Sequence, residues 1–165
     1  MKPVITFFLA CSLLLAGCSE KRPDVEELSQ RFFQYQTQFD QLAELSCRLK
    51  ASQNMTFHRY RVNTAMDYPE PMASQFLKID ALLKVIGAED IIFNPDGKPE
   101  CYLVVLQWSF VFAGDGSSMS YSYKPPKLHE YNPAIHHQDK RNTAEPIYFT
   151  KTLANDWYVE YDNTP

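Results

Sequence analysis

Histidine and carboxylate side chains, the usual ligands of transition metals in proteins, gather in one segment, residues 125–146. They are His129, Glu130, His136, His137 and Asp139. Zinc sites need three or four ligands at defined spacings on rigid elements, and neighbouring histidines in a segment broken by prolines do not provide them. We therefore expect exposed loop residues, no metal site and no other cofactor.

The same segment is a candidate for the recognition of another protein. A connection this long is uncommon in a compact domain, where it is usually functional or disordered. Exposed tyrosines also give interfaces a large contact area at low entropic cost. We predict a candidate interaction loop that uses His129, Tyr131, His136 and His137. The alternative, that the tyrosines simply cover the sheet, stays open.

The sequence lacks the common patterns of hydrolytic enzymes. No serine lies in a G-x-S-x-G motif, and the carboxylates are scattered. Gly114-Asp115-Gly116 precedes a predicted strand, whereas a phosphate-binding loop would be followed by a helix. We expect a protein that is not an enzyme, and a hydrolase whose site is assembled from distant residues is the least favoured alternative.

The N-terminus has the order of a secretory signal peptide. Lys2 is the only charged residue before Cys18, and residues 3–16 are almost wholly apolar. This run is shorter than the roughly 20 residues that cross a bilayer comfortably. It ends in Leu15-Ala16-Gly17-Cys18, which resembles the lipobox of bacterial lipoproteins.

This resemblance covers residues 1–18 only. It implies that the sulfur of Cys18 receives a diacylglyceryl group, that residues 1–17 are removed, and that the new amino group is acylated, for example with palmitate. Two or more chains anchor stably, at roughly 0.8 kcal/mol per buried methylene. In that family an aspartate directly after the cysteine favours retention at the inner membrane. Ser19 holds that position here, so the resemblance implies a protein in the outer membrane that faces the periplasm. The alternative is an ordinary signal peptide with a chance cysteine.

A short tether and one domain follow the signal. Residues 18–23 form the tether, whose five residues after Cys18 reach less than about 20 Å, and residues 24–165 form a single globular domain. The formal net charge of −4 makes nucleic acid a poor partner. We expect two partners, a lipid bilayer through Cys18 and a protein of unknown identity.

Two of the four cysteines remain for pairing. Cys11 leaves with the signal and Cys18 carries lipid, so Cys47 and Cys101 are the pair expected to form a disulfide in an oxidising periplasm. In the chain-entropy model, a disulfide that closes a loop of about 54 residues stabilises the folded state by roughly 4 kcal/mol. Two separately buried thiols are the alternative.

Two helices are expected before the sheet. The first begins after Asp24 and continues to about Lys50 as one long amphipathic helix, because apolar residues recur at spacings of three and four. The second spans residues 74–86 and ends at Gly87. Its predicted buried face holds Phe76, Ile79, Leu82, Leu83 and Ile86, and its predicted exposed face holds Lys78, Asp80 and Lys84.

Strands are expected at residues 91–93, 101–113, 117–124, 147–153 and 157–161, while residues 57–62 fit either a helix or a strand. Even-numbered residues from Tyr102 to Phe112 are predicted to share one face. A two-residue turn at Asp115-Gly116 would pair Phe112 with Met119. A three-residue turn at 154–156 would pair Phe149 with Tyr161.

Helices grouped before strands indicate an α+β fold, with two main N-terminal helices packed on one face of an antiparallel sheet of about five strands. Size and anchoring together favour a non-enzymatic protein-interaction module, such as a toxin immunity protein or an accessory subunit of an envelope machine. A small-ligand carrier that uses the sheet and the 125–146 loop is the alternative.

Overall fold

The computed structural model describes residues 22–97, 100–112, 115–136 and 146–164, and it confirms the α+β class. The helices are α1 (Val25–Gln34), α2 (Gln36–Gln53), α3 (Met72–Ile86), the short α4 (Pro133–His136) and the 3-10 turn η2 (Ala65–Asp67). The strands are β1 (His58–Arg61), β2 (Asp90–Phe93), β3 (Leu103–Phe112), β4 (Asp115–Tyr123), β5 (Ile147–Thr152) and β6 (Trp157–Thr164).

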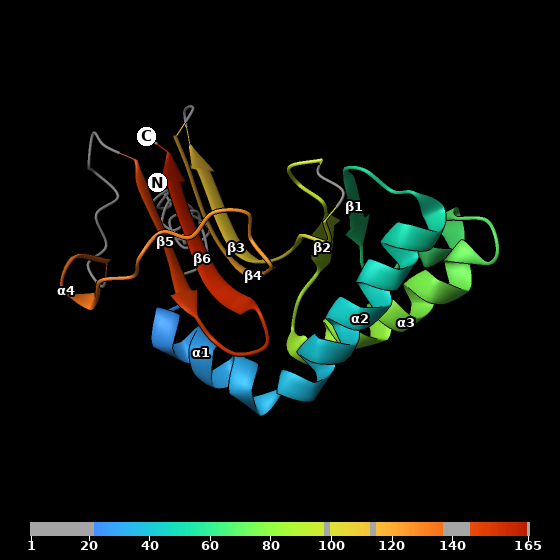
Figure 1. Cartoon of the computed structure of the whole chain (residues 1–165), viewed down its shortest axis with the longest axis horizontal. Coiled ribbons are helices and arrows are strands. Elements are labelled where there is room, and N and C mark those ends of the chain that lie inside the picture. The colour runs from blue at the N-terminus through green and yellow to red at the C-terminus, as the bar shows by residue number, and fades with distance from the viewer. Residues whose placement is uncertain (1–21, 98–99, 113–114, 137–145, 165) are drawn as a thin grey trace, which may run out of the picture.

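The six strands form one antiparallel sheet in the order β1-β2-β3-β4-β6-β5. Helices α1, α2 and α3 lie on one side of it, with α1 beside β5 and β6 and the α2–α3 pair at the β1–β2 end (Figure 1). We call the other side of the sheet the open face. The strand beyond the expected five is β1, which falls in the stretch that fitted either a helix or a strand.

The first helix begins where the sequence predicts. The Asp24 carboxylate accepts a hydrogen bond from the backbone amide of Glu26 at 2.7 Å, which satisfies one of the four amides that a helix start leaves unpaired. Acidic Glu26 and Glu27 lie in the first turn, where the helix dipole favours negative charge.

The prediction of one continuous first helix is wrong, because the chain bends at Tyr35. Tyr35 has φ −116° and ψ 23°, so α1 ends and α2 begins around it. In a straight helix, residues seven apart lie about 10 Å apart along the axis. The bend instead brings the rings of Phe32 and Phe39 to 5.0 Å between centroids. Neither glycine nor proline marks this position.

The centre of the core is an aromatic cluster at that bend. The Phe39 ring lies 4.6 Å from Tyr121 of β4 and 5.2 Å from Trp157 of β6, both in edge-to-face geometry. The Tyr121 hydroxyl donates to the backbone carbonyl of Leu28 at 2.8 Å. The side chains of Phe32, Phe39, Tyr121 and Trp157 make up this cluster and are fully buried. The cluster therefore fixes the bend between α1 and α2 against β4 and β6.

The predicted register between the third and fourth strands is wrong. Phe112 pairs with Asp115, so the connection falls at residues 113–114, outside the described residues, instead of at 115–116. A β-bulge between Leu106 and Trp108 then shifts the alternation by one residue. Leu103 and Val105 are buried against the helices before the bulge, and Trp108 is buried after it.

This bulge also corrects the face assignment of β3. Tyr102, Val104 and Leu106 lie on the open face, although the sequence pattern placed them with Trp108 on the core face. An uninterrupted run of apolar residues does not reveal where such a shift occurs, because both the odd-numbered and the even-numbered residues are apolar enough to face the core.

The C-terminal hairpin follows its predicted register. Phe149 pairs with Tyr161, and the amide of Leu153 donates to the carbonyl of Trp157 at 3.0 Å. Asn155 and Asp156 have φ of 52° and 63°, the left-handed conformation that this three-residue turn requires.

Helix α3 ends at Gly87 as predicted, with φ 73°. The prediction that Asp80 is exposed is wrong. Asp80 is buried, and its carboxylate accepts hydrogen bonds from the Tyr60 hydroxyl at 3.0 Å and the Asn63 amide at 2.8 Å. Burial alone would raise the pKa of Asp80, but these bonds and the Lys84 ammonium at 2.7 Å lower it overall.

Replacement of Phe39 tests the central cluster. Phe39→Ala should lower the free energy of unfolding by about 3–5 kcal/mol, because a fully buried ring would leave a cavity between the bend and the sheet. Phe33→Ala, at a ring that is 56% exposed, is the matched control and should cost less than about 1 kcal/mol. Urea unfolding of both variants makes the comparison, and equal losses would contradict the packing argument.

Candidate functional site

The predicted disulfide is present. Cys47, in the last turns of α2, is bonded to Cys101, two residues before β3, with a Cα–Cα distance of 5.5 Å. The bond ties the helix pair to the sheet at the end where α2 and α3 lie. Cys18 and His137 lie outside the described residues, so the lipid anchor and one residue of the candidate interaction loop have no structural description.

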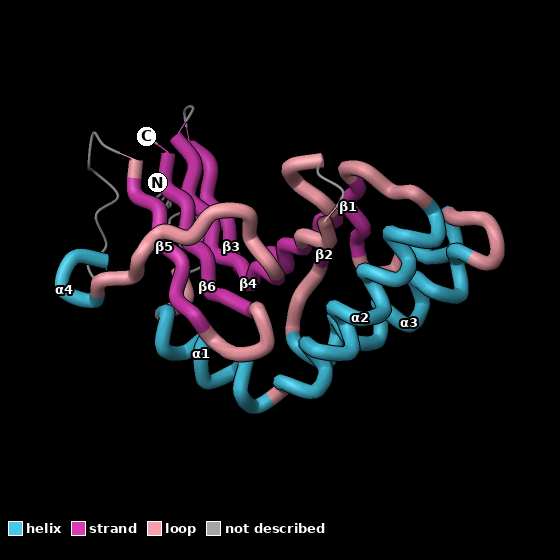
Figure 2. The backbone as a smooth tube through the Cα atoms, viewed as in Figure 1, coloured by secondary structure: helices cyan, strands magenta, loops and turns pink. Residues whose placement is uncertain are grey.

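The candidate interaction loop contains a strap, residues 124–136, that crosses the open face and follows the edge of the sheet (Figure 2). Glu130 forms a parallel bridge with Thr150 of β5. The His129 carbonyl accepts from the Thr150 amide at 2.6 Å, and the His129 amide donates to the Thr150 hydroxyl at 2.9 Å. The strap therefore covers the outer side of β5.

Beyond this bridge the strap packs on the core side of β5. The rings of Tyr131 and His136 lie 4.9 and 4.8 Å from that of Phe149. The Lys151 ammonium lies 5.6 Å from the Tyr131 ring and 2.6 Å from the Glu26 carboxylate. These contacts give Tyr131 and His136 a structural role, and their use in recognition stays a prediction.

A small hollow of about 100 Å³ lies under the strap. Its polar lining comes from Tyr102, Lys127, His129, Tyr148, Thr150 and Glu160. The Tyr102 hydroxyl donates to the Glu160 carboxylate at 3.4 Å. With a water molecule occupying about 30 Å³ in the liquid, the space suits a few small groups and no larger ligand.

Burial raises the pKa of the Glu160 carboxyl, and the nearby charge of Asp162 acts in the same direction. The hydroxyls of Ser122 and Tyr102 and the charge of His129 lower it without cancelling the effect of burial. The Ser122 hydroxyl is fully buried and makes no hydrogen bond of standard geometry within the described part of the chain, so we assign it the weaker influence on Glu160.

The described residues contain no group of three or more histidine, cysteine, aspartate or glutamate side chains that is able to hold a metal ion. His129 and His136 stand on opposite sides of the β5 edge, each beside an aromatic ring. Asp139 lies outside the described residues.

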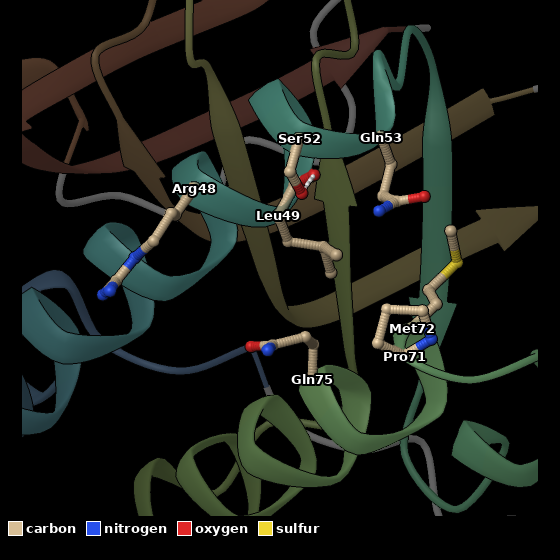
Figure 3. A pocket seen from close by; sticks show the side chains of 7 residues that line it. All are labelled: Arg48, Leu49, Ser52, Gln53, Pro71, Met72 and Gln75. Carbon is tan, nitrogen blue, oxygen red and sulfur yellow. Dashed lines mark hydrogen bonds between the residues drawn. The ribbon is translucent and has the colours of Figure 1, made fainter.

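A larger depression lies between α2 and α3, on the side turned away from the sheet. Two adjoining hollows, of about 310 and 550 Å³, share Arg48 and Gln75. In the first, Leu49 of α2 and Gln75 of α3 point into the space between the helices, and Pro71 and Met72 close its end (Figure 3). In the second, Leu45, Ala81 and Leu82 form the apolar part of the lining.

Helix α3 is apolar on its outer side as well. Leu77, Ala81 and Val85 recur at intervals of four residues, so they form one line along the helix. Leu77 and Val85 are each 49% exposed, although Phe76, Ile79 and Leu83 already fill the buried side. We call the two hollows together with this line the α2–α3 surface.

Sequence reasoning missed this surface, and the prediction that Leu82 belongs to the buried face is only partly right. Leu82 is half-buried at the rim of the second hollow. A signal was present, because α3 carries more apolar residues than one helix face can hold. The Tyr102–Glu160 contact was missed because the bulge in β3, which the sequence does not reveal, turns Tyr102 to the open face.

Comparison with known proteins gives no relative: no protein family, no curated protein and no solved structure matches this chain significantly. Within the part of the chain that the structure describes, no helix is both long and apolar enough to cross a bilayer.

The titration of Glu160 has a measurable consequence for stability. Since its pKa is higher in the folded than in the unfolded chain, the native state is favoured at low pH, and this contribution is lost as the pH rises above about 4.5 through the raised pKa. Glu160→Gln removes the titration, so the variant should gain stability relative to the natural protein between about pH 4.5 and 7.

Urea unfolding at several pH values in this range measures the effect. Glu70→Gln, at an exposed carboxylate away from the strap, is the control and should follow the natural protein at every pH. A constant difference between Glu160→Gln and the natural protein across the range would contradict the buried-carboxyl argument.

Proposed function

We propose that this chain is a bacterial lipoprotein, anchored through Cys18 in the outer membrane and facing the periplasm, whose domain is a non-enzymatic protein-interaction module. The α2–α3 surface is its binding face. The observation that carries this proposal is that α3 is apolar on two sides while only one side is covered.

An exposed apolar line beside an apolar hollow has an energetic cost in water. Burial of apolar surface is worth about 25 cal/mol per Å², so a second protein gains most where such surface is contiguous. Leu77, Ala81 and Val85 adjoin the hollow that Leu45 and Leu82 line, so the apolar groups form one region. Met66 and Val111 are also exposed, but neither of them lines these hollows.

The position of this surface suits a tethered protein. Arg22, where the described chain begins, lies with its guanidinium carbon 5.0 Å from the Tyr161 ring on β6. Helices α2 and α3 extend to the opposite end of the long axis (Figure 1). With lipid on Cys18, only four residues before Arg22, the sheet end would stay near the bilayer and the α2–α3 surface would be presented away from it.

A module that holds a partner benefits from a surface of fixed shape, because less freedom is then lost on binding. The disulfide between Cys47 and Cys101 supports such rigidity here. The small-ligand carrier is less well supported. The hollow under the strap has a volume of about 100 Å³, whereas ligand pockets usually measure about 300–1,000 Å³. A second hollow beside the strap reaches about 550 Å³, but its lining is rich in polar groups such as His129, Glu130 and Asn132, whereas ligand pockets are mostly apolar.

The anchor is tested by Cys18→Ala. We expect an uncut precursor that carries no acyl mass, because the sulfur that forms the thioether is lost. Intact mass spectrometry of the membrane fraction measures both the removal of residues 1–17 and the acylation. Cys11→Ala is the control and should mature normally. Full acyl mass on the Cys18→Ala protein would contradict the assignment.

The binding face is tested by the double variant Leu77→Asp with Val85→Asp, in which charges replace the exposed apolar line. Both residues are half exposed, so the fold should tolerate the change, as circular dichroism can verify. A partner that co-purifies with the natural protein from solubilised envelopes should be lost from the double variant.

The matched control is Met66→Asp with Val111→Asp, at side chains that are 77% and 78% exposed elsewhere on the molecule. It should retain the partner. Equal retention by both double variants would place the binding face outside the α2–α3 surface.

A further inference from the structure

We infer that the α2–α3 surface binds an amphipathic α-helix of about three turns whose apolar face is flanked by acidic residues. This inference rests on the proposed function and specifies the chemistry of the partner. Its three parts, the helical form, the length and the charge, each follow from the residues that line the hollows.

The helical form follows from the hydrogen bonding of the two walls. Both sides of the depression are helices, α2 and α3, whose backbone groups bond within each helix. No strand edge is presented between them, so an extended segment would find no backbone partners there. A bound segment must satisfy its own amides and carbonyls while it buries side chains, and an α-helix does so.

The length follows from the extent of the lining. The contacts of α3 run from Met72 to Leu82, and those of α2 run from Gln41 to Gln53. At 1.5 Å per residue these spans are about 15 and 18 Å, which matches a helix of about 10–12 residues. The two helices run antiparallel, because the end of α2 faces the start of α3 in the first hollow.

The lining chemistry sets which face of the partner helix is buried. Leu49 and Met72 lie in the first hollow, and Leu45 and Leu82 lie in the second. Apolar side chains spaced by three, four and seven residues on a helix would meet these groups in turn. The amides of Gln41, Gln53 and Gln75 border this lining and offer hydrogen bonds to polar flanking residues.

The charged residues that line the hollows favour acidic residues beside the apolar face of the partner helix. Three charged side chains line the hollows, Glu44, Arg48 and Lys78, and Glu44 is bonded to Arg48 at 2.9 Å. The charged side chains of the lining therefore sum to one positive charge, although the whole chain has a formal charge of −4. Carboxylates opposite Lys78 would gain attraction, and a basic helix would be repelled.

Site-specific photo-crosslinking in the encoding bacterium tests the inference with the full-length, anchored protein. Gln75, which lies in both hollows, is replaced by p-benzoyl-phenylalanine, and Lys127 on the strap is replaced in a second strain as the control. Mass spectrometry then sequences the peptide attached to each position. We expect an adduct at Gln75 alone, from an amphipathic segment with acidic flanks.

The trapped segment is then synthesised, and its affinity is measured by fluorescence anisotropy. Lys78→Glu should weaken binding three- to tenfold at low salt, and the difference should shrink at high salt. Lys78→Arg and Lys127→Glu are the matched variants and should bind as the natural protein does. Circular dichroism of the bound peptide should show gained helix.

The remaining outcomes separate the two proposals. An adduct from a second copy of this chain or from lipid, a segment without a helical apolar pattern, or an affinity indifferent to Lys78→Glu would overturn the helix inference and leave a protein-binding surface in place. Absence of any adduct at Gln75, together with partner retention in the Leu77→Asp, Val85→Asp protein, would overturn both.

Discussion

The packing of Phe39 between Tyr121 and Trp157 is the interaction on which the rest of the structure depends. It joins the bend at Tyr35 to the neighbouring strands β4 and β6, with ring centroids 4.6 and 5.2 Å from that of Phe39. Because the helices meet at this point, α1 lies along β5 and β6 while α2 diverges toward β1 and β2 (Figure 1). A straight helix would cover only one of these regions.

The direction of α2 determines the surface that α3 can form. α3 packs beside α2 and covers β1 and β2 with Phe76, whose ring stacks on Tyr60 at 4.2 Å. With that side committed to the sheet, the remaining apolar residues of α3 face outward. The disulfide at Cys47 holds α2 to the start of β3, so the hollow between the helices has a fixed frame. The proposed binding surface is thus a consequence of the bend.

The sequence predicted those features that depend on a few neighbouring residues. The Asp24 cap, the Gly87 stop and the three-residue turn at 154–156 each have a local chemical cause, and each was confirmed. The disulfide followed from counting cysteines. The α+β class followed from the order along the chain, in which helical spacings of three and four residues come before the two-residue alternation of strands.

The features that were missed depend on contacts between distant residues. The bend at Tyr35 goes with the packing of Phe39 on Trp157, the bulge in β3 with its pairing to β4, and the burial of Asp80 with its hydrogen bond from Tyr60. No local pattern contains this information. The α2–α3 surface was missed for the same reason, because only the packed structure shows which of two apolar faces on α3 is left over.

The strap has a consequence for the behaviour of many copies together. An unpaired edge strand is a template on which another chain can add by backbone hydrogen bonds. Here His129 and Glu130 occupy the edge of β5, and the opposite edge is the four-residue β1, which carries Arg59 and Arg61. A covering segment at one edge, and a short strand with arginine side chains at the other, both disfavour strand addition, so backbone pairing between copies is discouraged at each edge of the sheet.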